Sequence, residues 1–328
     1  MLIRDLAHGT DLDQVLLVRD VQRKQRPDGS EVVRLVLADR TGGVPAIVTE
    51  DLTVALELCR AGEPVHVTGR FEVHPRYGRQ IEVAGLGPAV DGTFDPAQLV
   101  DGPPRDADQM EADLRELVAT IHDPHLRALL DAVFGEGSPT WAAYRVAPAA
   151  KLYHQAYVHG LLEHSLSVAQ AVSAISATFP GIDREVAVTG ALLHDIGKLE
   201  AYTAEAPIDL TDAGRLQGEI PLGYYRVRRL IEELVVDGEP FPAAISQAVL
   251  HIILSHHGTL EHGSPVVPCT REATLVHFMD NLGGRLGSFD RLEKGLAPGS
   301  AWSSYDRALG SGAYFGPIRA EDRRREAA

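Results

Sequence analysis

The hydrophobic period of this 328-residue sequence changes once, near residue 100. Residues 14–89 contain short apolar runs separated by turn sequences rich in Gly, Pro and Asp, which is typical of β-strands. From residue 110 onward, apolar residues recur three and four positions apart, which is typical of amphipathic α-helices. The sequence therefore predicts two domains, a small all-β domain followed by a larger all-α helical bundle.

The first part contains five expected strands, with a helix between the third and the fourth. This number and order predict an OB-fold barrel over residues 1–90. The strands are expected at residues 15–18, 32–37, 44–48, 65–69 and 80–83, and the helix at 52–61.

The second part is expected to follow a linker at residues 91–106, which has Gly and Pro but no sustained period. The helical domain is expected to span residues 107–318, ahead of a charged tail at 319–328. Its helices are expected at residues 110–121, 126–134, 158–177, 184–193, 225–234, 243–254 and 273–282.

Composition limits the classes of function. The chain is 45% hydrophobic and 23% charged, as in ordinary globular proteins. No apolar run reaches the roughly 18–20 residues of a membrane span, and residues 1–10 do not resemble a signal peptide. We therefore expect a cytoplasmic protein without membrane contact.

Cys59 and Cys269 lack the spacing of a zinc or redox motif, and we expect both to be buried. The formal net charge of -15 requires any contact with nucleic acid to be local.

The loops of the expected barrel carry basic and aromatic residues. In an OB-fold, the loops between strands one and two and between strands four and five flank the ligand face. Cationic and aromatic side chains there bind phosphates and stack on bases, although ordinary solvated hairpin tips have a similar composition. The sequence predicts binding of a single strand by Arg23, Lys24, Arg26, Arg76, Tyr77 and Arg79.

Histidine and aspartate residues occur within or at the ends of several expected helices. Burying an imidazole or a carboxylate costs free energy unless it is paired or bound to a metal, and facing helices of a bundle commonly build metal sites. One such histidine alone is more often a hydrogen-bonded core residue, but the whole set favours a divalent metal centre. The set comprises His164, His194, Asp195, His256, His257 and Asp280.

The order of this set resembles the HD-superfamily phosphohydrolases: a His, then His-Asp followed by Gly and Lys, then His-His, then Asp. The resemblance implies that His164, His194, Asp195 and Asp280 hold one divalent ion. It implies that His256 and His257 complete a second site that shares Asp195.

A metal ion lowers the pKa of a bound water and screens phosphate oxygens, which hydrolysis of a phosphodiester requires. We expect Asp195 to be the central catalytic carboxylate and Lys198 to stabilise the transition state. A lysine at this position also suits the C-terminal end of a helix. His154, Tyr157 and His159 are expected either to line the cleft or to pack in the core.

Longer segments resemble the YhaM-type 3'-5' exoribonucleases, which join an OB-fold to an HD domain. The resemblance implies a manganese-preferring exonuclease of single-stranded RNA that acts on single-stranded DNA as a further substrate and assembles as a homo-oligomer. Mg²⁺ and Fe are the other candidate ions. The segments that carry the resemblance are residues 148–150, 154–164, 192–199, 250–258, 263–265 and 272–282.

Two positions depart from that family. Glu219 follows Gly218 where the family has a histidine that serves the second metal. Carboxylates bind Mn²⁺ and Mg²⁺, so we expect a second site that is either changed in metal preference or weakened. Gly283 follows Leu282 where the family has an aspartate, which removes an acidic group near the cleft.

Two other functions stay open at this point. A hydrolase of a small mono- or cyclic nucleotide, with a regulatory barrel, would suit the acidic composition. A nucleic-acid-binding protein with a degraded HD site is suggested by Glu219, although the six other candidate ligands are retained. Deleting residues 1–104 would separate the first alternative from the exonuclease, because cleavage of long RNA would suffer more than cleavage of a small phosphodiester.

Overall fold

The computed structural model describes residues 1–26, 29–74, 78–95, 98–99, 105–150, 155, 157–203, 208–294, 296, 300–306 and 309–316. The chain divides into two compact units. One comprises Met1–Asp101 with Ser288–Ala328, and the other comprises Gly102–Gly287. The expected domain boundaries at residues 90, 106 and 318 stay predictions.

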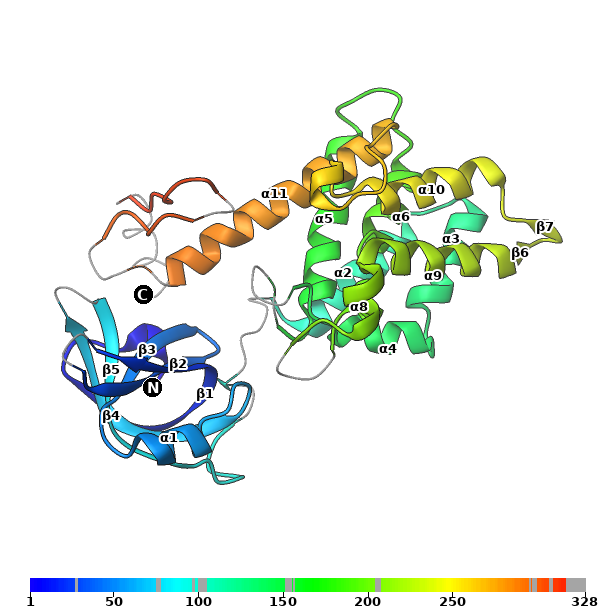
Figure 1. Cartoon of the computed structure of the whole chain (residues 1–328). Coiled ribbons are helices and arrows are strands. Elements are labelled where there is room, and N and C mark those ends of the chain that lie inside the picture. The colour runs from blue at the N-terminus through cyan, green and yellow to red at the C-terminus, as the bar shows by residue number, and fades with distance from the viewer. Residues whose placement is uncertain are drawn as a thin grey trace. The chain divides into compact units, whose positions relative to one another are not determined.

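The first unit contains a closed five-stranded barrel (Figure 1). Its strand order is β1-β2-β3-β5-β4, and β1 also pairs with β4 to close the barrel. This is the order of an OB-fold, which confirms the expected fold class. The elements are η1 (Ile3–Asp5), β1 (Thr10–Gln25), β2 (Glu31–Asp39), β3 (Gly42–Val48), α1 (Leu52–Leu58), β4 (Pro64–His74) and β5 (Gly78–Pro88).

Alternating side chains fill the barrel. Val33, Leu35 and Leu37 on β2 are fully buried, as expected for a strand with one face toward a core. The pairing of β4 with β5 shifts register between Thr68 and Gly69. A side chain on Gly69 would collide with the backbone of β5, so glycine allows the bulge that bends β4 around the barrel.

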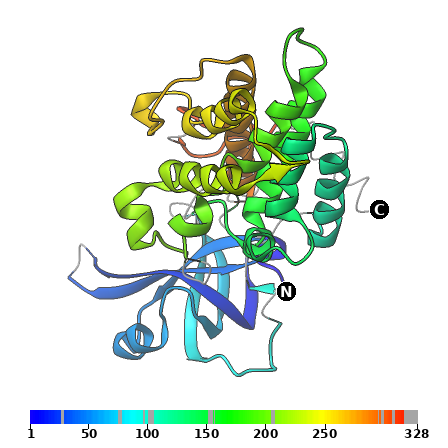
Figure 2. The same cartoon turned by 90° about the vertical axis from the view of Figure 1, so that its right-hand side faces the viewer.

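The strands are longer than the sequence predicts because their pairing continues beyond the apolar core. The β1–β2 ladder extends to the pair Gln25 and Glu31. Figure 2 shows this hairpin, in blue, projecting from the barrel. Its outer part is polar, so the apolar pattern in the sequence could not reveal its length.

The second unit is helical, with a core cluster that shares no residue with the barrel core. α6 packs closely on α10 where a side chain on Gly190 would overlap Ile252. The helices are α2 (Ala107–Ala119), α3 (Pro124–Phe134), α4 (Pro139–Val146), α5 (Gly160–Ser176), α6 (Arg184–Leu193), α7 (Lys198–Ala201), α8 (Asp212–Gln217), α9 (Glu219–Glu233), α10 (Ala243–Ser255), η3 (Leu260–His262) and α11 (Arg271–Lys294).

Several helix boundaries differ from the sequence-based expectation. The short helices α4 and α8 were not expected, α9 begins at Glu219 instead of residue 225, and α11 continues past residue 282 to Lys294. Leu282 and Leu286 on α11 are about half exposed, and Ser288 and Leu292 are the buried residues among the described side chains of this helix beyond residue 282. The apolar stripe on which periodicity depends is therefore interrupted in this part of the helix. Two-residue strands β6 (Val235–Val236) and β7 (Glu239–Pro240) add a small hairpin to the helical unit.

Within the described part of the chain, no helix combines the length and apolar character that crossing a bilayer requires.

Candidate metal centre

Five helices deliver the candidate ligands to one place. His164 lies in the first turns of α5, and Glu219 is the first residue of α9. His194 and His256 are the C-cap residues of α6 and α10, which places Asp195 and His257 just beyond those helices. Asp280 lies on α11. Helix ends therefore supply most of the ligand atoms.

The first group of ligand atoms surrounds one oxygen of Asp195. The Nε2 atoms of His164 and His194 each lie 3.3 Å from Asp195 Oδ2, and they lie 3.2 Å from one another. Asp280 Oδ1 lies 3.1 Å from His164 Nε2 and 3.8 Å from His194 Nε2. Four side chains thus direct nitrogen or oxygen atoms toward a common point.

A second group lies on the other oxygen of Asp195. His256 Nε2 lies 3.4 Å from Asp195 Oδ1. His257 Nε2 lies 3.2 Å from Glu219 Oε1. Ligand atoms of Glu219, His256 and His257 all lie within 4.8 Å of one another. Asp195 stands between the two groups, with one oxygen toward each.

Hydrogen bonds at Nδ1 orient these imidazoles. The Nδ1 atoms of His194, His256 and His257 donate to the backbone carbonyl oxygens of Ala191, Ile253 and His262, at 2.7, 2.8 and 2.8 Å. Donation from Nδ1 leaves the Nε2 lone pair of a neutral imidazole free to bind a metal, which is the arrangement usual for metal-binding histidines. His164 Nδ1 lies 3.1 Å from Gln155 Oε1 in the same way.

The charges around Asp195 shift several pKa values. Burial would lower the pKa of His194, but the carboxylates of Asp195 and Asp280 raise it to about 9. Burial would raise the pKa of Asp195, but Lys198 and His194 hold it well below its usual range. For His256, burial dominates and lowers the pKa. The centre therefore holds ionised carboxylates beside imidazoles that need a proton or a cation.

The residues fit a divalent ion. His256 Nε2 is buried and, apart from Asp195 Oδ1 at 3.4 Å, has no hydrogen-bond partner among the described residues, and such an atom is costly unless something binds it. His194 Nε2 faces His164 Nε2 and carboxylate oxygens, so acceptors crowd together at a point where a cation would satisfy them. Imidazole and carboxylate ligands suit first-row divalent metals.

Lys198 lies inside this centre. Its Nζ donates to Asp195 Oδ2 at 2.7 Å, and Asp195, Glu219 and Asp280 together outweigh burial and raise its pKa. α6 ends at Leu193 and Lys198 begins the four-residue helix α7, so Lys198 lies beyond the last turn of α6.

Glycine brings the start of α9 to the His-Asp turn. A side chain on Gly197 would overlap the backbone of Glu219 and Gly223. Gly218, just before α9, has φ 79°, a conformation that glycine adopts without strain. These glycines allow Glu219 to reach His257.

The structure gives the expected cleft residues other contacts. The Tyr157 hydroxyl donates to the carboxylate of Glu163, and both residues are buried. His159 Nδ1 donates to the Arg145 carbonyl oxygen at 2.6 Å. Neither is part of the ligand groups found among the described residues, and His154 lies outside the described residues.

The basic residues of the barrel fall into two kinds. Arg23, Lys24 and Arg26 are exposed near the end of β1, and Arg23 forms an ion pair with Glu31 on β2. Arg79 differs from the expected solvated loop residue. Its Nη2 donates to the Ile3 carbonyl oxygen of η1 at 2.9 Å, and its guanidinium lies 5.2 Å from the centre of the Phe71 ring. Arg76 and Tyr77 lie outside the described residues.

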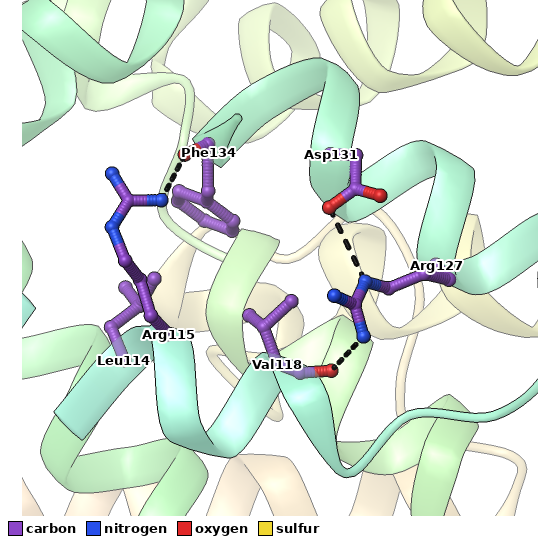
Figure 3. A pocket seen from close by; sticks show the side chains of 6 residues that line it. All are labelled: Leu114, Arg115, Val118, Arg127, Asp131 and Phe134. Carbon is purple, nitrogen blue, oxygen red and sulfur yellow. Dashed lines mark hydrogen bonds and ion pairs between the residues drawn. The ribbon is translucent and has the colours of Figure 1, made fainter. Parts of the chain in front are cut away.

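A separate pocket lies between α2 and α3 (Figure 3). Its two arginines are already bonded: Arg115 donates to the Phe134 carbonyl oxygen at 3.1 Å, and Arg127 donates to the Val118 carbonyl oxygen at 3.2 Å and pairs with Asp131. The arginines therefore stabilise the packing of α2 on α3.

Sequence reasoning missed two residues that orient ligands. Gln155 contacts His164, and His277 Nδ1 donates to the His256 carbonyl oxygen at 2.7 Å. His277 lies three residues before Asp280 on α11, and this spacing places both on one helix face, a signal that could have identified it. No local pattern pointed to Gln155, since its contact crosses from a loop to α5.

Comparison with known proteins adds independent findings. Residues 161–284 match the family model of the HD domain, which implies dependence on a divalent metal. The protein named 3'-5' exoribonuclease YhaM of Shouchella clausii (strain KSM-K16) is 28% identical over 322 residues, 96% of this chain and 96% of that protein. The protein of the same name from Bacillus subtilis (strain 168) is 27% identical over 298 residues, 89% of this chain and 90% of that protein.

A solved structure, the second OB-fold domain of replication protein A from Methanococcus maripaludis, is 20% identical. The match covers 29% of this chain and 98% of that chain, with a TM-score of 0.23.

Proposed function

We propose that this chain is a metal-dependent 3'-5' exonuclease of single-stranded RNA. The premises are the match of its residues 161–284 to the HD domain and its similarity, over nearly its whole length, to YhaM 3'-5' exoribonucleases. The observation that carries the proposal is the convergence of imidazole and carboxylate atoms on both oxygens of Asp195. Retention of this set argues against a degraded site.

We assign the ligands as follows. His164, His194, Asp195 and Asp280 hold one divalent ion, and Asp195, Glu219, His256 and His257 hold a second. Mn²⁺ suits the mixture of nitrogen and oxygen atoms, with Mg²⁺ and Fe as the other candidates. When bound, the metal supplies an activated water and neutralises phosphate charge.

The protein side chains contribute positioning and charge. Asp195 bridges the two groups, so its ionised carboxylate sets their separation. The Nδ1 hydrogen bonds hold the imidazoles with Nε2 directed inward. Lys198, which has an exposed side-chain fraction of 11%, keeps its cation beside Asp195 and places positive charge where the scissile phosphate would bind.

The OB-fold barrel would hold the single strand, with Arg23, Lys24 and Arg26 as exposed phosphate contacts and Arg76 and Tyr77 as further candidates. Arg79 would act by stabilising η1 on the barrel. Single-stranded DNA as a second substrate, a homo-oligomeric assembly and a cytoplasmic location complete the proposal, each supported by the resemblance or the composition described above.

The decisive experiment uses a 5'-labelled single-stranded RNA and the full-length protein with Mn²⁺, Mg²⁺ or EDTA. Resolved on a sequencing gel, the products should form a metal-dependent ladder that shortens from the 3' end. Intact RNA in every lane, or internal cuts, would contradict the proposal.

Asp195→Ala is the matched variant, because it removes the carboxylate shared by both ligand groups. We expect hydrolysis to be lost while RNA binding stays near that of the wild type, since the barrel is unchanged. Turnover by this variant at the wild-type rate would exclude the proposed centre.

A further inference from the structure

A small hairpin near the C-terminal end presents aromatic side chains to solvent. Trp302 and Tyr314 form an antiparallel bridge. The backbone bonds Ser303 N–H to Ala313 O (2.9 Å) and Phe315 N–H to Ala301 O (2.7 Å) flank this bridge. A pair flanked in this way has its side chains on the same face of the hairpin. The rings lie 4.9 Å apart with an interplanar angle of 48°.

Glycine supports one of these rings. A side chain on Gly316 would overlap the ring of Tyr314, so that ring lies directly against bare backbone. Despite this support, Tyr314 is 55% exposed and Trp302 is 59% exposed, and Tyr305 between them in sequence is 72% exposed. Large aromatic side chains are usually buried, because each removes much apolar area from water. The hairpin instead holds them open to solvent.

The segment that contains this hairpin has fewer acidic residues than the chain average. The chain has 46 acidic residues among 328. Between Lys294 and Arg319 the sequence contains one acidic residue, Asp306. Asp306 is buried, and its Oδ1 accepts a hydrogen bond from the Leu309 N–H. The low acidic content of this segment therefore reduces the local repulsion of a polyanion on a protein with a net charge of -15.

We propose that Trp302 and Tyr314 form an aromatic platform on which the bases of a single-stranded nucleic acid stack. Every base has a π-face, so aromatic platforms bind single strands with little sequence preference. Stacking also needs no net positive charge, so on an acidic chain it would add to the local phosphate contacts proposed for the barrel. The proposal deepens the proposed function and rests on it for the choice of RNA as ligand.

Tryptophan fluorescence tests the platform directly. The chain has two tryptophans. Trp141 is 8% exposed in the helical core, so quenching by bases would report on Trp302. The full-length protein is titrated in EDTA, which prevents cleavage, with a single-stranded RNA of about 12 nucleotides, within the range of site sizes known for single-strand binders. We expect quenching that saturates with RNA, and no quenching by an abasic sugar-phosphate strand of the same length.

Variants separate stacking from folding. In fluorescence anisotropy with labelled RNA, we expect Trp302→Ala and Tyr314→Ala to weaken binding by about tenfold each, the effect of losing one stacked base. Trp302→Phe and Tyr314→Phe keep an aromatic ring and should bind within about twofold of wild type, which shows that the hairpin tolerates substitution. Tyr225→Ala is the matched control, because Tyr225 is an exposed tyrosine (62%) on α9 and should leave binding unchanged.

The outcomes distinguish this proposal from the exonuclease proposal. Quenching by RNA together with an absent cleavage ladder would support the platform and contradict the nuclease. Normal cleavage without quenching, and with unchanged binding by Trp302→Ala, would overturn the platform and leave the nuclease intact. Loss of self-association in Trp302→Ala with unchanged RNA binding would also overturn it, since the rings would then join copies of the chain.

Discussion

Glu219 adds a carboxylate to the second ligand group, whose other members beside Asp195 are histidines. Its Oε1 lies 3.2 Å from His257 Nε2. Burial would raise its pKa, but Lys198 and His257 lower it, so the carboxylate is ionised at neutral pH. An ionised oxygen ligand favours Mn²⁺ or Mg²⁺ over metals that prefer nitrogen.

We therefore expect Glu219→Gln, which keeps the size of the side chain and removes its charge, to weaken binding of the second ion at least about tenfold. Calorimetric titration with Mn²⁺ should then resolve one tight equivalent in place of two. Glu232→Gln is the control, because Glu232 pairs with Arg228 on the exposed face of α9. Two tight equivalents in Glu219→Gln would show that the carboxylate is no ligand.

The two cysteines should differ in reactivity. Cys59 is buried in the barrel core, and burial raises the pKa of its thiol to about 11. Cys269 is exposed, which corrects the expectation that both are buried; it lies in the segment before α11, where solvent reaches its thiol. The thiolate is the reactive form, so a raised pKa lowers the reactive fraction at a pH of about 8.

We expect iodoacetamide at a pH of about 8 to modify Cys269 and leave Cys59 intact, as measured by peptide mass spectrometry. Modification of Cys59 should rise only as the pH approaches about 11, provided that the barrel stays folded. Equal labelling of both thiols at the lower pH would contradict this prediction.

The turn after α10 is the element that joins the second ligand group to α11. Gly258 has φ 84°, and a side chain there would overlap the imidazole of His277. That imidazole donates to the carbonyl oxygen of His256. Close contact between this glycine and this ring thus holds His256 and His257 in place relative to Asp280.

Gly258→Ala should therefore destabilise the protein by about 2–4 kcal/mol. This loss is the sum of two costs, that of a left-handed backbone conformation at alanine and that of displacing the packed ring of His277. Gly238→Ala is a matched control. Gly238 has φ 85°, and a Cβ there would meet no neighbouring atom of the described residues within 4 Å, so only the conformational cost of about 1 kcal/mol remains. Urea denaturation measures the free energy of unfolding of both variants. Equal losses of this free energy would show that the contact with His277 is unimportant.

At the scale of the molecule, the barrel and the helical unit have separate cores. All candidate metal ligands belong to the helical unit, Gly102–Gly287. A ligand stabilises only the cooperative unit that binds it, by an amount set by its concentration relative to its Kd.

We expect calorimetry to show two unfolding transitions, one for each unit. Mn²⁺ at about a hundred times its Kd should raise the midpoint temperature of the helical unit by about 5–10 °C. EDTA should reverse the shift, and Asp195→Ala should abolish it. A single transition, or an equal shift of both, would show that the units unfold together.

Local pattern in the sequence determined the architecture. The change of hydrophobic period predicted a five-stranded barrel followed by helices, because side-chain periodicity follows from the backbone geometry of each element. The spacing of His194-Asp195, His256-His257 and Asp280 also indicated a metal-binding set, since such residues in apolar helices are costly without a ligand.

Only the tertiary structure decided which atoms meet. It directs one oxygen of Asp195 toward each histidine group, brings Gln155 to His164 and His277 to His256, and uses Arg79 to hold η1 on the barrel. The start of α9, the end of α11 and the exposed pair Trp302 and Tyr314 were likewise outside the reach of the sequence. These features join residues from different elements, and periodicity describes one element at a time, so packing between elements alone determines them.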